Sequence, residues 1–178
     1  MITDERWNGG GFIPPRMIGL LNREREFYMA TRDGHPQPWP YDGHHGPKAM
    51  LINRSAGSGG DCFPWLFKHH DLGPVIGTRT WGGLVGYGSV PGFIDGSGCA
   101  VPNWAFYEND GTWGVEGYGV DPTHPVMDDP ALMLNGGDPQ VDVAIDLMLE
   151  AIETNPRIDV PIPAYPNRAG MGITDEDR

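Results

Sequence analysis

The chain has 178 residues, 39% of them apolar, which is enough for one domain with a hydrophobic core. Its 24 acidic residues outnumber its 12 basic ones, and the net charge of −12 argues against nucleic acid or an anionic membrane surface as a partner. No apolar run approaches the ~20 residues of a membrane-spanning helix. The two cysteines are too few for a disulfide scaffold.

Apolar periodicity, interrupted by turns rich in glycine and proline, predicts alternating strands and helices. In chain order the expected elements are a strand at 1–6, a helix at 13–26, a long loop at 33–46, a buried strand at 49–52, a helix at 63–70, a strand at 74–77, strands at 100–107 and 113–116, and a helix at 138–152. The last helix has Asp138 as its cap and Pro139 in its first turn. Because the chain is proline-rich and polar after residue 156, we expect 157–178 to form a surface tail.

The serine turn Ala56-Gly57-Ser58-Gly59-Gly60 lies between a predicted strand and a predicted helix. Glycines allow the backbone to turn sharply there, and the free amides at a helix start can stabilise an oxyanion. A second glycine loop, Gly9-Gly10-Gly11, has the same kind of position, so two sets of backbone amides are expected to face one point. Taken alone, both loops are also compatible with tight strand-to-helix turns that have no catalytic role.

Other residues with chemical potential give weaker patterns. The chain has six histidines, two pairs of them adjacent, but no cysteine or carboxylate stands beside these pairs at ligand spacing. We therefore expect neither a metal nor a cofactor. Trp81, Trp104 and Trp113 are compatible with a sugar-binding platform, although packing in the core or at its rim is the favoured interpretation.

Four segments, in this order along the chain, carry a resemblance to a known family: 4–12 (DERWNGGGF), 53–61 (NRSAGSGGD), 73–83 (GPVIGTRTWGG) and 114–122 (GVEGYGVDP). They resemble segments of the tail-specific, or carboxyl-terminal processing, serine proteases, and most closely those of the tricorn type. The resemblance implies an α/β fold of the crotonase and caseinolytic-protease superfold, with repeated strand-helix units. Residues 1–156 would form the C-terminal part of the catalytic domain, so that the domain is partial.

The resemblance further implies a serine-type peptidase that acts through an acyl-enzyme on Ser58. The backbone amides of Gly11 and Gly59 would form the oxyanion hole, and Glu116 would orient and polarise the base system. The implied partner is a peptide or protein substrate, and the rings formed by the family imply a homo-oligomer of the full-length form. The expected compartment is the cytoplasm, or the periplasm or exterior if a signal precedes this sequence.

No catalytic base stands in the matching segments. Many tail-specific proteases pair the serine with a lysine, but the matching region here has Gly82 and Gly83, and the only lysines are Lys48 and Lys68. The tricorn arrangement remains, in which a histidine takes the serine proton and a glutamate supports that histidine through a second serine. In that family the histidine lies upstream of the segment at which this chain begins. We therefore expect the isolated chain to have little activity.

Two alternatives remain open at this point. One is a small α/β-hydrolase esterase with Ser58 as nucleophile, Asp95 or Asp110 as acid and His124 as base, since these residues follow one another in the required order. Against it, a nucleophile elbow requires glycine two residues before the serine, where this chain has Ala56. The other alternative is a non-catalytic fragment that keeps the fold as a structural or binding module.

Overall fold

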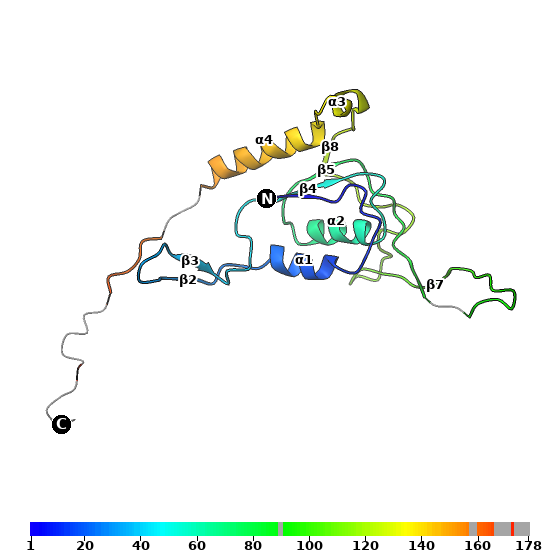
Figure 1. Cartoon of the computed structure of the whole chain (residues 1–178), viewed down its shortest axis with the longest axis horizontal. Coiled ribbons are helices and arrows are strands. Elements are labelled where there is room, and N and C mark those ends of the chain that lie inside the picture. Colours follow the sequence, from blue (N-terminus) through cyan, green and yellow to red (C-terminus); the bar gives the residue numbers. More distant parts are fainter. Residues whose placement is uncertain (89–90, 157–159, 166–171, 173–178) are drawn as a thin grey trace.

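Four short parallel strands form the central sheet of the computed structural model, which describes residues 1–88, 91–156, 160–165 and 172 (Figure 1). In spatial order they are β1 (Ile2–Asp4), β4 (Ala49–Ile52), β5 (Val75–Gly77) and β8 (His124–Pro125). Every neighbouring pair is parallel. The carboxyl ends of β1 and β4 therefore meet at one edge of the sheet, where both strands lead into glycine-rich turns.

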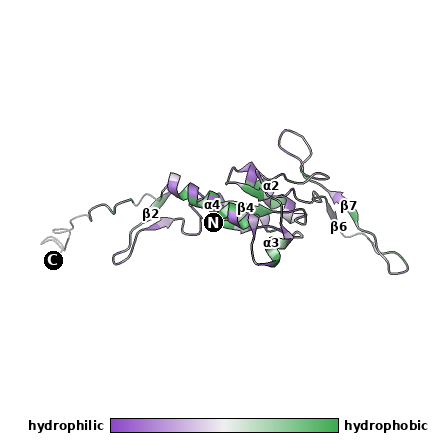
Figure 2. Cartoon of the chain, turned by 90° about the horizontal axis from the view of Figure 1, so that it is seen from above, coloured by the Kyte–Doolittle hydropathy of each residue, from purple (hydrophilic) through white to green (hydrophobic). Residues whose placement is uncertain are grey.

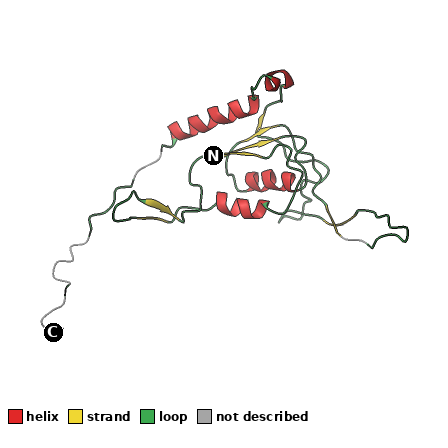
Figure 3. Cartoon of the chain, viewed as in Figure 1, coloured by secondary structure: helices red, strands yellow, loops and turns green. Residues whose placement is uncertain are grey.

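Helices cover both faces of this sheet (Figure 3). α1 (Pro14–Leu21) and α2 (Gly59–His69) pack on one face, and α4 (Pro139–Thr154) packs on the other. Successive side chains of β4 point to opposite faces, so that Met50 joins the core with α1 and α2 while Leu51 joins the core with α4. Burial on both sides explains why β4 is a continuous apolar run without polar alternation.

Two hairpins extend from this body toward opposite ends of the molecule (Figure 2). They are formed by β2 (Phe27–Met29) with β3 (Gln37–Trp39), and by β6 (Gly86–Gly88) with β7 (Val101–Trp104). A short helix, α3 (Pro130–Leu134), lies between β8 and α4. Among the helices of the described residues, none is long and apolar enough to cross a lipid bilayer.

The segments with the clearest periodicity fold as predicted. The strand expected at 49–52 is β4, and the helix expected at 138–152 is α4. Asp138 caps this helix, since its carboxylate accepts hydrogen bonds from the backbone N–H groups of Gln140 and Val141. The expected α/β class with parallel strands and strand-helix units is confirmed.

Several predicted boundaries were wrong. The first helix ends at Leu21 instead of continuing to residue 26, because charged residues occupy the next turn where an apolar residue would be needed. The loop expected at 33–46 contains β3, and the strand expected at 113–116 is reduced to one isolated bridge between Trp113 and Tyr107. The predicted tail at 157–178 lies largely outside the described residues.

Candidate active site

Ser58 lies at the junction of β4 and α2 in a backbone conformation that is unusual for a residue with a side chain. Its φ of 55° and ψ of −113° place it in a region that favours glycine, and such strain persists only where the surroundings fix it. The Ser58 N–H is held by the carbonyl of Gly83 at 3.0 Å and by the carboxylate of Asp61 at 2.9 Å. The half-buried Ser58 side chain lines a cavity beside this turn.

The glycine loop after β1 packs directly on this turn. Gly57 N donates to the carbonyl of Asn8 at 2.9 Å, which joins the two loops. A Cβ on Gly10 would lie 2.8 Å from the Cβ of Ser58, and a Cβ on Gly59 would lie 2.7 Å from the amide nitrogen of Gly11. Only residues without side chains allow this approach, and Gly10 also has a φ of 128° that favours glycine.

The amides of Gly11 and Gly59 lie beside Ser58 around one cavity of about 270 Å³. Gly59 is the first residue of α2, so its N–H has no partner within the helix. Among the described residues, neither amide donates a hydrogen bond to a protein acceptor. The two glycines and the serine that the sequence singled out are thus brought together, and the two unengaged amides belong to residues that line the same cavity.

Asp61 is a residue of this site that the sequence reasoning missed. Its carboxylate is fully buried and accepts hydrogen bonds from the N–H groups of Ser58, Gly82 at 2.8 Å and Gly83 at 3.0 Å. One side chain therefore fixes the serine turn and the loop that follows β5 against each other. The spacing of Ser58 and Asp61, a serine followed three residues later by an acid at a helix start, is the capping pattern that could have indicated it.

Glu116 adjoins the cavity without being one of its lining residues. Its Oε2 accepts hydrogen bonds from the N–H of Leu84 at 2.5 Å and of Val85 at 2.6 Å, two residues that line the cavity. The residue as a whole is exposed and is not part of the cavity lining. The role of Glu116 in orienting and polarising the base system stays a prediction.

The cavity also contains a thiol that could compete with the serine as a nucleophile. Cys62 lies one helical turn after Ser58 and lines the same space. Burial raises the pKa of the Cys62 thiol, and the negative charge of Asp61 adds to the increase. The thiol therefore stays protonated at neutral pH, and a protonated thiol is a poor nucleophile.

Comparison with known proteins decides the family. Residues 1–126 match the model described as peptidase family S41. The chain belongs to this family. The tricorn protease of Thermoplasma acidophilum is 42% identical over 152 residues, which are 85% of this chain and 14% of that protein. Tricorn protease homolog 1 of Streptomyces coelicolor is 36% identical over 156 residues, which are 88% of this chain and 15% of that protein.

Solved structures agree with this assignment. The crystal structure of the tricorn protease matches with a TM-score of 0.80 at 42% identity, covering 85% of this chain and 15% of that one. The photosystem II D1 C-terminal processing protease matches with a TM-score of 0.52 at 25% identity, covering 71% of this chain and 34% of that one. The resemblance to tail-specific proteases of the tricorn type is confirmed, and this S41 chain spans less than a fifth of the length of its tricorn relatives.

The esterase alternative is not supported by the arrangement of this S41 chain. His124 lies in β8, its Nδ1 is 3.0 Å from the hydroxyl of Thr123, and it lines a different cavity from Ser58. Asp95 and Asp110 each accept hydrogen bonds within their own exposed turns, which lower the pKa of both carboxyls. The three groups of the hypothetical triad therefore do not meet.

All six histidines lie in the described part of the S41 chain, and none lines the cavity of Ser58. Neither lysine lines it. Lys68 donates to the carbonyl of Asp121 at 2.7 Å on the outer side of α2. No group of three His, Cys, Asp or Glu side chains in the described residues is placed to hold a metal ion. Among the described residues, no basic side chain lines the cavity that Ser58 faces.

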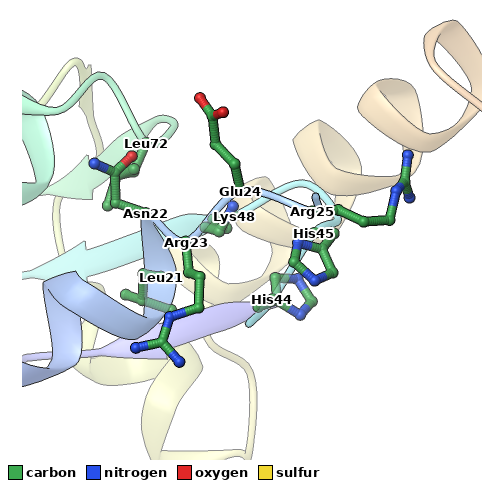
Figure 4. Close-up of a pocket in the computed structure, with 9 residues that line it drawn as sticks. All are labelled: Leu21, Asn22, Arg23, Glu24, Arg25, His44, His45, Lys48 and Leu72. Carbon is green, nitrogen blue, oxygen red and sulfur yellow. The ribbon is translucent and has the colours of Figure 1, made fainter. Parts of the chain in front are cut away.

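Basic side chains gather instead around a second cavity of about 380 Å³ (Figure 4). It lies at the other end of the central strand, because Lys48 precedes β4 whereas the serine turn follows it. His44 and His45 each place Nε2 near a backbone carbonyl of their own loop, at 3.4 and 3.2 Å. Arg23 and Arg25 point in different directions (Figure 4). These side chains brace the loop before β4 and do not converge on one point.

Proposed function

We propose that this S41 chain carries the nucleophile half of a serine peptidase and that Ser58 attacks the scissile carbonyl of a peptide or protein substrate. The observation that supports this most directly is the contact between the two glycine loops at Ser58. Its support is that Gly11 and Gly59, whose amides donate to no acceptor among the described residues, line the same cavity as Ser58. This is the arrangement that acyl transfer requires, because the carbonyl oxygen becomes an oxyanion when the serine attacks.

The chemistry divides into two steps. Ser58 Oγ forms a bond to the carbonyl carbon while its proton passes to a base, and the oxyanion is held by the amides of Gly11 and Gly59. Collapse of this intermediate expels the amine of the C-terminal product, which receives the proton, and leaves an ester on Ser58. Water then attacks the ester by the same route and releases the N-terminal product.

The base in this proposal is a histidine from outside the described residues, in a longer polypeptide or in a partner chain. The support is that a serine hydroxyl needs an adjacent base at neutral pH, whereas no histidine or lysine of this chain lines the cavity. Glu116 has a place in such a base system. Only its Oε2 accepts the wall amides in the described structure, which leaves Oε1 free to accept a hydrogen bond from an incoming group.

Active-site labelling tests the proposal. The natural full-length protein should react with a fluorophosphonate at Ser58, as located by mass spectrometry, and should hydrolyse peptides. Ser58→Ala should abolish both, whereas Ser55→Ala, a change of an exposed serine in the same turn, should leave both intact. Labelling or hydrolysis that survives Ser58→Ala would contradict the proposal.

A further inference from the structure

Trp104 forms one wall of the cavity beside Ser58 by lying flat against a glycine of the neighbouring strand. Trp104 in β7 is the register partner of Gly86 in β6, and a Cβ at Gly86 would overlap the indole ring. The ring also approaches Phe12 and Phe106, with centroid distances of 6.2 and 5.3 Å. Gly86 thus leaves room for the indole, and three aromatic rings from two separate segments, Phe12 from one and Trp104 with Phe106 from the other, line one side of the cavity.

The cavity bounded by this wall has no charged group. All of its described lining residues are uncharged, with Leu84, Val85 and Cys62 completing the apolar side. Two carboxylates that bond to residues of the lining are already engaged by backbone amides. Asp61 accepts three backbone N–H groups, and the Oε2 of Glu116 accepts the N–H groups of Leu84 and Val85. A charged substrate side chain in the cavity would lose its hydration without gaining a partner.

The cavity also has a suitable size and position for one substrate side chain. Its volume of about 270 Å³ lies just below the roughly 300–1,000 Å³ typical of sites for drug-sized ligands. Ser58, Gly11 and Gly59 are among the residues that line it. The side chain of the residue that supplies the scissile carbonyl branches from the atom next to that carbonyl, so it begins within reach of this space.

From these observations we infer that Trp104 is a specificity-determining residue. With Phe12 and Phe106 it makes the cavity accept a large apolar side chain, an aromatic one above all, from the residue that supplies the scissile carbonyl, and exclude charged ones. Stacked or edge-on aromatic contacts favour a ring over an aliphatic chain of similar area. This inference rests on the proposed function, since it takes Ser58 as the point of attack.

A matched peptide series tests it on the natural full-length protein. The peptides differ only at the residue that supplies the scissile carbonyl, which is Phe, Leu, Lys or Glu. The kcat/KM values of the Phe and Leu peptides should be roughly 10-fold or more above those of the Lys and Glu peptides. Trp104→Ala should lower kcat/KM about 10-fold for the Phe peptide and leave the slow Lys peptide unchanged, since the lost contact is a ring-ring contact. Trp104→Phe should restore most of the preference.

Two further variants separate specificity from folding. Gly86→Ala, which displaces the indole, should reproduce the selective loss of Trp104→Ala. Trp113→Ala removes an exposed tryptophan that does not line the cavity and should change nothing. Equal kcat/KM for Lys and Phe peptides, or an equal loss on all peptides in Trp104→Ala, would overturn the inference while leaving the peptidase assignment intact.

Peptide binding to the chain tests the role of Trp104 even if no peptide is cleaved. In the Ser58→Ala chain, calorimetry should show an N-acetylated peptide ending in Phe binding roughly 10-fold more tightly than the one ending in Lys. Trp104→Ala in the same background should remove this difference. If the difference appears but Ser58 of the wild-type full-length protein is neither labelled nor active, the peptidase proposal fails and the cavity is an aromatic binding site only. If the two peptides bind equally, the inference about Trp104 is overturned.

Discussion

The backbone N–H of Ser58 donates to the carboxylate of Asp61 at 2.9 Å, and the same carboxylate reaches across to the amides of Gly82 and Gly83. A single buried acid thus holds the strained serine turn to the loop that forms the next wall of the site. Because three amides donate to one fully buried carboxylate, removing its charge should disturb both segments together.

Asp61→Asn is expected to lower stability by about 1–3 kcal/mol, because the amide group of asparagine presents a donor to at least one buried N–H. In the full-length protein, kcat should fall by a larger factor than KM changes, because the serine turn and not the substrate cavity is displaced. Denaturant unfolding and steady-state kinetics measure the two effects. Asp71→Asn, a change of an exposed acid after α2, should affect neither, and an unaltered kcat in Asp61→Asn would contradict its positioning role.

Gly10→Ala should lower kcat roughly 100-fold, the scale of losing one oxyanion donor. A Cβ there would lie 3.0 Å from Ser58 Oγ at a φ of 128°, so the loop carrying Gly11 must move away from the serine. Gly9→Ala is the control, because a Cβ at Gly9 meets nothing within 4 Å. Similar kinetics for the two variants would show that the close approach of the loops has no catalytic importance.

Glu116→Gln should lower turnover by about 100-fold while the protein stays folded. The amide oxygen of glutamine can still accept the hydrogen bonds of Leu84 and Val85, so the wall is retained. What is lost is the negative charge that would support a cationic histidine base. The kinetics and thermal unfolding of Glu116→Gln are compared with those of a control variant, Glu150→Gln, which changes an exposed acid of α4. Unchanged turnover would make Glu116 a structural residue of the wall alone.

The ion pair between Arg6 and Asp138 predicts an acid-dependent loss of stability. Arg6 lies 2.8 Å from Asp138 and 2.7 Å from Asp4, and its hydrogen bond lowers the pKa of the Asp138 carboxyl below the ordinary value. A carboxyl with a depressed pKa in the folded state stabilises the fold above the unfolded pKa of about 3.9 and loses this contribution as the pH falls through the lower folded value.

Thermal unfolding between pH 7 and pH 2 measures this contribution. Arg6→Met should unfold at a lower temperature than the wild type at pH 7, and the gap should narrow as the pH falls below about 4. Arg16→Met, a change of an exposed arginine on α1, should give a curve parallel to that of the wild type. A gap between Arg6→Met and the wild type that stays constant down to pH 2 would show that the pair does not contribute through this titration.

The sequence by itself determined the parts of this protein that depend on neighbouring residues. The apolar run at 49–52, the Asp138 cap of α4 and the two glycine loops after strands are local patterns, and each was found where the pattern placed it. The order of four short motifs was enough to indicate the family. Parallel pairing of β1 and β4 then brings the ends of two predicted strands together, which explains why Gly11 and Ser58 meet.

Only the tertiary structure decided the partners of the carboxylates and the composition of the cavity wall. The carboxylate of Asp61 accepts hydrogen bonds from amides more than 20 positions away, and that of Glu116 from amides more than 30 positions away. These hydrogen bonds therefore depend on how separate loops pack. The same holds for Trp104, which is paired with Gly86 and thereby lines the same cavity as Ser58. The residue type determines which groups a side chain can bind. The fold determines which distant groups come within hydrogen-bonding or van der Waals distance of it.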